Sequence, residues 1–410
     1  MKIKNILAIA VVAALAPMAM ADTTINITGA TAFRAAALTA LKNTFSGNLT
    51  YAYDGGTYTS STYAILKGTY PGISGVTTIR TSFSGSVEGI RDVSLQNNVN
   101  FLPTSTATTS GGNGSQDVGT VVGAKPQLAF SDVFADSTPY NASLTEGANA
   151  GIIAFRFVAS KGSSLTNITA QQFRALAGNG VQPLGLWTGN PADNSTTVYL
   201  SGRNDGSGTR VTTLAETGFG YANVVNQWKG VVSGSGNSTV VTSLQIWPTN
   251  DGANKSFIFN NDTAANGGYS SGGSLGGLLQ GSTGNVTTKD ATGTTIATGQ
   301  NLVIIGYLGT NDSYNAVTNG AVALNYNGSQ LNVNSSGITN PDVIRNGNYT
   351  FWAYEHLFWV AGSRTGDLDT LVTKLLGTDG LDNATNLGNA GIQISTMNVS
   401  RGDDGGLVGP

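Results

Sequence analysis

One glycine-rich stretch decides the fold class of this chain: Leu200-Ser-Gly-Arg-Asn-Asp-Gly-Ser-Gly-Thr-Arg210. A β-like run precedes it at 197–200, and a helix-compatible run follows it at 211–216. The pattern predicts a turn that opens a helix directly after a strand. The free backbone N–H groups and the positive end of such a helix suit an oxyanion.

Two charged residues in this turn sharpen the interpretation. Arg203 can supply the forked donors of a guanidinium group, and Asp205, two residues on, can hold that group in place. In a chain with 56 glycines, a plain surface turn is the alternative. The combination of Arg, Asp and glycines at this spacing favours an anion-binding loop.

The N-terminus has the pattern of an export signal. Lys2 and Lys4 precede a short apolar core at 6–20, and Ala19-Met20-Ala21 fits a cleavage site, so residues 1–21 are predicted to be a signal peptide. The apolar stretch is too short to span a bilayer comfortably, and no membrane insertion is expected. The sequence holds no cysteine, which excludes disulfides, thiolate metal sites and a cysteine-linked lipid anchor. We therefore expect a periplasmic protein without a lipid anchor.

Length and charge limit the class further. A chain of 410 residues suggests two domains, and its charged fraction of 10% lies far below the ~25% of average soluble domains. Loss of Lys2 and Lys4 with the signal would change the formal net charge from −3 to −5. A net negative chain argues against nucleic acid as a partner.

Strands and helices alternate along the first half of the chain. Extended runs at 24–27 and 77–81 are each followed by a small-residue turn and a helical run, at 32–42 and 87–92. This alternation predicts an α/β fold with a parallel sheet. Ligands of such sheets bind at the carboxyl ends of the strands. Four such ends carry polar residues that suit an anion: Thr31, Ser84, Asp132 and the turn Ser207-Gly208-Thr209.

These motifs, in this order, resemble a known family. They are similar to the loops of the phosphate-binding protein of the ABC-type phosphate uptake system, a type II periplasmic binding protein. The resemblance covers most of the chain after the signal, and its motifs are Gly29-Ala-Thr-Ala-Phe33, Ser84-Gly-Ser-Val87, Ser131-Asp132 and Arg203-Asn-Asp-Gly-Ser-Gly-Thr209. The last is the specific one. The first departs from the family pattern, with Ala32-Phe33 where Phe-Pro is usual.

The resemblance implies a two-lobed fold with mixed, mostly parallel sheets flanked by helices and the ligand between the lobes. Lobe I would comprise residues 22–148 and 326–410, and lobe II residues 149–325, with a Gly/Ser/Thr/Asn-rich hairpin region at 229–300. The resemblance also implies a monomer that captures inorganic phosphate and delivers it to an ABC permease, without a metal, a cofactor or a catalytic residue. The implied phosphate-binding residues are Thr31, Ala32, Ser84, Asp132, Arg203, Ser207, Gly208 and Thr209, with Asp205 supporting Arg203.

Asp132 needs a separate explanation, because a carboxylate facing an anion is repulsive. Phosphate near neutral pH still carries a proton that a carboxylate can accept, whereas sulfate does not. Asp132 would therefore reject sulfate by leaving two acceptors face to face. A role in capping a helix or turn is the alternative for this residue.

Other functions stay open at this stage. The fold could bind another oxyanion or a phosphate ester, or it could serve as a secreted surface or structural protein whose pocket holds no small anion. A phosphatase is disfavoured because one histidine and no cysteine leave few nucleophile–base pairs. We therefore expect no enzymatic activity.

Overall fold

The computed structural model describes residues 21–140, 145–249, 251, 258–259, 262–388 and 391–410. The predicted signal peptide thus falls almost wholly outside the described residues. The strands are β1 Thr23–Gly29, β2 Gly47–Tyr53, β3 Tyr63–Thr69, β4 Thr77–Ser82, β5 Val99–Phe101, β6 Val122–Ala124, β7 Leu128–Ser131, β8 Thr145–Ala159, β9 Asn167–Ile168, β10 Val181–Pro183, β11 Thr197–Leu200, β12 Trp228–Ser233, β13 Val240–Ile246, β14 Val286–Lys289, β15 Thr295–Gln300, β16 Leu302–Gly309, β17 Val322–Ala323, β18 Asn325–Tyr326, β19 Val333–Asn334, β20 Gly337–Ile338 and β21 Trp352–Val360. The α-helices are α1 Arg34–Asn43, α2 Ser86–Ser94, α3 Ala170–Asn179, α4 Gly185–Thr188, α5 Gly208–Glu216, α6 Gly272–Leu279, α7 Thr310–Thr318, α8 Asp342–Arg345, α9 Gly366–Leu376 and α10 Ala384–Leu387.

A single mixed sheet forms the centre of the molecule. Its strands run in the order β10-β11-β16-β8-β21-β7-β1-β4-β3-β2. Among the strands of the described residues, β1 pairs in parallel with β4 and β7, β11 with β16, β13 with β14, and β9 with β18. The predicted mixed α/β architecture is confirmed, and antiparallel pairing is more extensive than the sequence pattern suggests.

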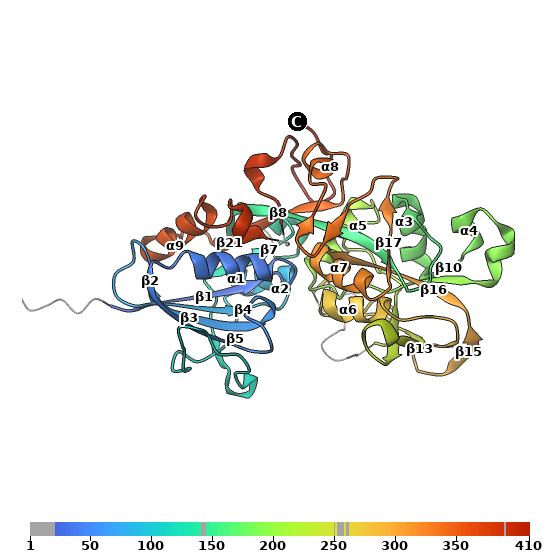
Figure 1. Ribbon diagram of the computed structural model, residues 1–410, viewed down its shortest axis with the longest axis horizontal. Helices are drawn as coiled ribbons and strands as arrows, with labels where there is room; N and C mark the ends of the chain where they lie inside the picture. The colour runs from blue at the N-terminus through green and yellow to red at the C-terminus, as the bar shows by residue number, and fades with distance from the viewer. Residues whose placement is uncertain (1–20, 141–144, 250, 252–257, 260–261, 389–390) are drawn as a thin grey trace, which may run out of the picture.

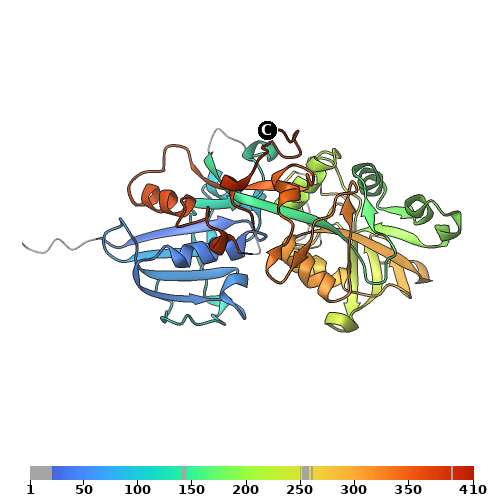
Figure 2. The ribbon, with the colours of Figure 1, turned by 45° about the horizontal axis from the view of Figure 1, so that its top comes forward.

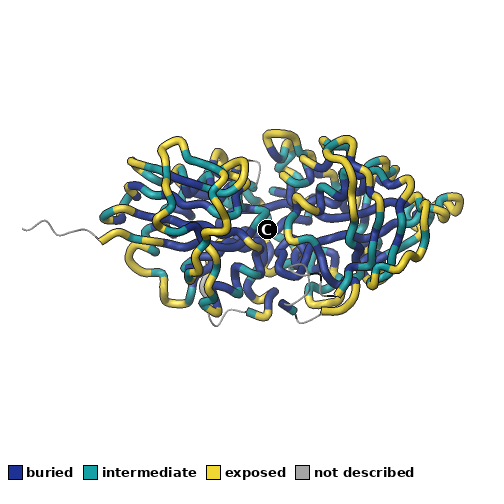
Figure 3. Tube along the Cα trace, turned by 90° about the horizontal axis from the view of Figure 1, so that it is seen from below, coloured by how far each residue is buried: buried dark blue, intermediate teal, exposed yellow. Residues whose placement is uncertain are grey.

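Two groups of elements lie at opposite ends of this sheet (Figure 1). We call them lobe I, with β1–β7, α1, α2 and α9, and lobe II, with α3–α7 and β9–β16. Strand β8 connects them, because its residues 145–154 pair with β21 and its residues 155–159 pair with β16. Figure 2 shows β8 running between the two ends, and Figure 3 shows buried segments of the chain inside both.

The predicted elements of the first lobe are largely present. The run at 24–27 lies in β1, the run at 77–81 lies in β4, and the helical runs at 32–42 and 87–92 lie mostly in α1 and α2. These elements bury Ile27, Leu38 and Ile79, each at 0% exposure, in one core that continues into lobe II. Both faces of β1 and β4 are buried, so their polar residues also lie in the core, where Arg80 Nε donates to Asn26 Oδ1 at 2.8 Å.

The region 229–300 differs from the expectation of hairpins and loops. It contains the four-stranded sheet β12-β13-β14-β15, but also the helix α6. Ser271 caps α6 by accepting the Ser274 N–H at 3.1 Å, and Leu275, Leu278 and Leu279 are buried on one side of it. Helical spacing of these leucines therefore outweighs the low helix propensity of the glycines between them.

Candidate anion-binding site

The glycine-rich turn folds as the sequence predicts. Strand β11 ends at Leu200 and α5 begins at Gly208, with Ser207 as its N-cap residue. The Ser207 hydroxyl accepts the Arg210 N–H at 3.4 Å. Ser207 and Thr209 are each 2% exposed, so the N-terminus of α5 is directed into the protein and not into solvent.

Arg203 connects the two lobes. Its side chain is 2% exposed, Nε donates to the Tyr269 carbonyl at 3.0 Å, and Nη2 donates to the Ser270 carbonyl at 3.0 Å. Nη2 also lies 3.5 Å from the Thr31 hydroxyl oxygen of lobe I. Burial lowers the pKa of Arg203, and the nearby Asp312 and Asp132 carboxyls oppose this shift. Within the described residues Nη1 makes no hydrogen bond, so two N–H donors remain for a ligand.

Asp205 has a different role from the predicted one. Its carboxylate oxygen Oδ2 accepts the Ile258 N–H at 2.7 Å and the Phe259 N–H at 3.4 Å. Two backbone carbonyls hold the Arg203 guanidinium instead, and no hydrogen bond joins Asp205 to Arg203 among the described residues. Asp205 therefore anchors the segment at 258–259 to the turn.

Asp132 lies at the meeting point of two helix N-termini. It is 1% exposed, and the described residues give neither of its carboxylate oxygens a hydrogen bond of regular geometry. Gly208 lies against it so closely that a Cβ on Gly208 would be 1.6 Å from Oδ1 and 2.7 Å from the Ser86 Cβ. Burial raises the pKa of Asp132, and the adjacent Ser86 hydroxyl and the Arg203 charge oppose the rise.

The serine that faces this carboxylate is Ser86. The predicted Ser84 is exposed and lies beside Glu88, whereas Ser86 is 3% exposed and is the first residue of α2. The Val87 N–H donates to the Gly206 carbonyl at 3.2 Å, so the start of α2 touches the turn before α5. In Ser84-Gly85-Ser86, the second serine is the one at the helix start, and this position is the signal that could have identified it.

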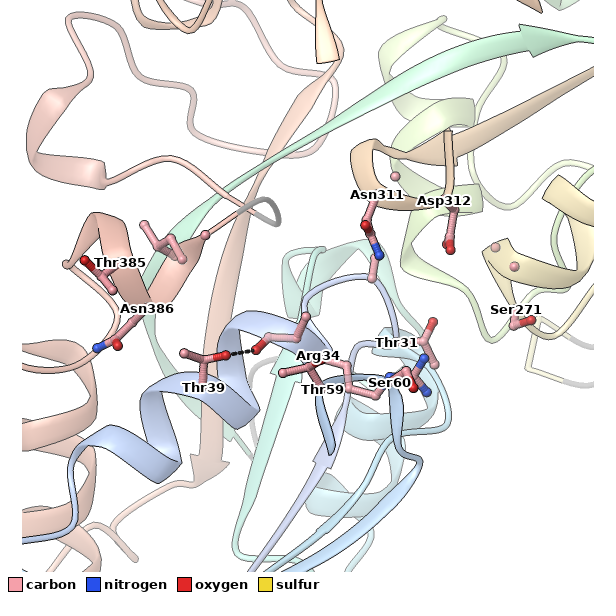
Figure 4. Close-up of a pocket in the computed structure, with 17 residues that line it drawn as sticks. Thr31, Arg34, Thr39, Thr59, Ser60, Ser271, Asn311, Asp312, Thr385 and Asn386 are labelled. Atoms are coloured by element: carbon pink, nitrogen blue, oxygen red, sulfur yellow. Dashed lines mark hydrogen bonds between the residues drawn. The ribbon is translucent and has the colours of Figure 1, made fainter. Parts of the chain in front are cut away.

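Thr31 and Ala32 line a cavity of about 410 Å³ between the lobes. Its walls are the start of α1, the N-termini of α6 and α7, and the segment 385–388. Figure 4 shows Asn311 and Asp312 on one side of this cavity, and Arg34 on the other. No motif in the sequence marks these three residues as part of a site, because they lie outside the glycine-rich motifs of the chain.

The structure thus brings Thr31, Asp132, Arg203 and the turn 207–209 together, and it leaves Ser84 outside. The group combines a buried cation, a buried carboxylate with no hydrogen bond of regular geometry to the described residues, hydroxyl groups and the positive ends of two helices. Such a set can bind a small oxyanion that still carries a proton.

Among the described residues no cluster of three or more His, Asp or Glu could hold a metal ion. The part of the chain that the structure describes contains no helix long and apolar enough to cross a bilayer.

No protein-family model and no curated protein matches the sequence significantly. Several solved structures that resemble the chain over most of its length are named as phosphate-binding proteins or phosphate transport receptors. One of them, from Clostridium perfringens, is provisionally named a phosphate ABC transporter substrate-binding protein and contains bound phosphate. Its sequence identity to this chain is 12% and the TM-score is 0.47, and the alignment covers 90% of this chain and 99% of that one. PstS from Borrelia burgdorferi has 12% identity, a TM-score of 0.39 and coverages of 90% and 99%. An ABC-type phosphate transport receptor from Vibrio cholerae has 11% identity, a TM-score of 0.42 and coverages of 88% and 96%. Because these TM-scores lie below 0.5, the function proposed below rests on the residues of this chain.

Proposed function

We propose that the chain is an extracytoplasmic solute-binding protein that captures inorganic phosphate between its two lobes for delivery to an ABC permease. The ligand would bind where Thr31 of lobe I meets Arg203 of lobe II, at the start of α5. Donors on both lobes would favour the closed form when the anion is bound.

The observation that carries this proposal is the buried Asp132 carboxylate, neither oxygen of which has a hydrogen bond of regular geometry among the described residues. A buried polar group in this state is costly unless a ligand or a proton satisfies it. Protonated phosphate offers an O–H donor to Asp132 while its other oxygens accept from Arg203. Sulfate offers no proton, and two unit charges ~4 Å apart repel by about 4 kcal/mol at an effective dielectric constant near 20.

The remaining residues would supply hydrogen bonds to the phosphate oxygens. Thr31 and the Ala32 N–H would contribute from lobe I, together with Ser86, which replaces Ser84 in this role. Ser207, Gly208 and Thr209 would contribute from the N-terminus of α5, where the helix dipole favours an anion. These local charges and dipoles must outweigh the formal net charge of −3.

We expect binding without turnover. Within the described part of the chain, the cavity beside the site is lined by threonine, serine and asparagine side chains together with Arg34 and Asp312, and no histidine lies among the lining residues. The protein would act as a monomer in the periplasm, without a lipid anchor, since the sequence contains no cysteine.

Equilibrium binding of radiolabelled phosphate to protein freed of bound anions tests this proposal. Arg203→Gln should weaken phosphate binding by roughly a hundredfold, because a charge-assisted hydrogen bond contributes about 1.5–3 kcal/mol. Arg345→Gln, at a partly exposed arginine paired with Asp342, serves as the matched control and should bind as the parent does. Equal binding by Arg203→Gln and the parent would exclude this site, and turnover of a phosphate ester would favour an enzyme instead.

A further inference from the structure

The cavity between the lobes continues directly from the proposed phosphate site. Thr31 belongs to both, because its hydroxyl oxygen lies 3.5 Å from Arg203 Nη2 and its side chain lines the cavity. The cavity therefore begins beside the residue of lobe I that contacts Arg203.

The cavity is much larger than inorganic phosphate requires. At roughly 30 Å³ for each water, its volume of about 410 Å³ would hold about a dozen water molecules. Phosphate displaces the volume of only about two or three waters. The volume lies in the range, about 300–1,000 Å³, that is typical of sites for small organic ligands.

Two opposite charges face this space from the two lobes. Arg34, the first residue of α1, forms no hydrogen bond or ion pair within the described residues, and the same holds for Asp312 on α7. Burial raises the pKa of Asp312, and the charge of Arg203, followed by that of Arg34, opposes the rise. Burial lowers the pKa of Arg34, and the charge of Asp312 opposes this change. Figure 4 shows Asn311 and Asp312 directed toward the side of the cavity that holds Arg34.

The charged and polar residues that line the cavity favour one chemical class of ligand. Arg34 repels a second cation and Asp312 repels a second anion, whereas an apolar group would neither accept a hydrogen bond from Arg34 nor donate one to Asp312. A neutral group with several hydroxyls can donate to Asp312 and accept from Arg34 and the Asn311 amide.

We propose that this cavity is a subsite for the hydroxyl-bearing part of a polyol phosphate monoester, which the protein binds in addition to inorganic phosphate. The inference rests on the proposed function, because the phosphoryl group of the ester would occupy the site at Arg203.

Calorimetric titration with inorganic phosphate, glycerol phosphate and phenyl phosphate tests the subsite. We expect glycerol phosphate to bind at least as tightly as inorganic phosphate and about tenfold more tightly than phenyl phosphate, because only the glycerol group satisfies Arg34 and Asp312. Arg34→Gln should lower the affinity for glycerol phosphate about tenfold more than that for inorganic phosphate. Arg364→Gln, at a partly exposed arginine that pairs with Asp369 on lobe I, is the matched control.

The outcomes separate the two proposals. Binding of inorganic phosphate without either ester would overturn the subsite and leave the proposed function intact. Binding of neither phosphate nor ester would overturn both. Equal affinity for the glycerol and phenyl esters would exclude a hydroxyl-specific subsite. Should Arg34→Gln fail to fold, Asn311→Ala at the exposed cavity rim carries the same comparison.

Discussion

Gly208 of lobe II lies in direct contact with the Asp132 carboxylate of lobe I, and a Cβ at this glycine would sit 1.6 Å from Oδ1. The contact joins the start of α5 to the loop after β7, so any side chain at position 208 separates the lobes. Glycine is required here because of close approach and not because of an unusual backbone angle.

Gly208→Ala should therefore prevent closure of the lobes. We expect a loss of phosphate affinity of at least about tenfold, with ~1–3 kcal/mol lower stability from overpacking. Calorimetry and chemical denaturation measure the two effects. Gly277→Ala is the matched control, because a Cβ there meets nothing within 4 Å. Unchanged phosphate binding by Gly208→Ala would mean that closure at this contact is not needed.

Asp132→Asn should narrow the difference between phosphate and sulfate affinity. The amide keeps the shape of the side chain, removes its negative charge and adds a donor that sulfate can use. We expect the ratio of the two affinities to fall by about ten- to a hundredfold. Competition of each anion against labelled phosphate measures the ratio, and Asp136→Asn at an exposed position is the control. A constant ratio would mean that Asp132 plays no part in selectivity.

Glu355→Gln should make stability less dependent on pH. Glu355 is 0% exposed, both of its oxygens lack hydrogen bonds among the described residues, and burial followed by the Asp132 charge raises its pKa well above the usual value. The folded protein therefore holds a proton that the unfolded chain releases near pH 4.5, so this carboxyl lowers stability progressively as the pH rises above that value.

Denaturation of the two proteins at several pH values between 5 and 8 measures this effect. The variant should gain stability over the parent by up to about 1.4 kcal/mol for each pH unit in this window. Asp404, whose pKa burial raises to about 7, titrates in both proteins and cancels in the difference. If the free energy of unfolding of the parent and of the variant changed equally with pH, Glu355 would not be a buried neutral acid.

Arg401→Leu should destabilise the protein more than the double variant Arg401→Leu/Glu216→Leu. Arg401 pairs with Glu216 at 3.1 Å, and their side chains are only 1% and 6% exposed. Removal of one partner leaves a buried charge unpaired and costs about 3–5 kcal/mol, whereas removal of both restores much of the loss. Denaturant titration measures the free energy of unfolding of both variants. Equal losses in the single and the double variant would indicate that the two charges do not stabilise each other.

Local patterns predicted the parts of the fold that depend on neighbouring residues. Thr169 and Gln172, at the spacing typical of a capping box, form one at the start of α3, and Ser207 caps α5. By contrast, the helix α6 lies where the sequence predicts a hairpin region, because its stability comes from burial of Leu275 and Leu278 against the sheet. Glycine-rich composition alone does not reveal such packing.

Distance along the chain explains what the sequence could not identify in the site. Arg34 and Asp312 face the same cavity from α1 and α7, and nothing in their local sequence relates them. Asp205 follows Arg203 at a spacing that suits pairing, but the backbone directs its carboxylate to Ile258. Only the folded structure decides which of two nearby polar groups meets a given partner.

The central claim is tested most directly by calorimetric titration of anion-free protein with phosphate and, separately, with sulfate near neutral pH. We expect one phosphate to bind to each chain, and we expect sulfate at the same concentration to produce no saturable heat. Equal binding of both anions, or no binding of phosphate by the folded protein, would contradict it.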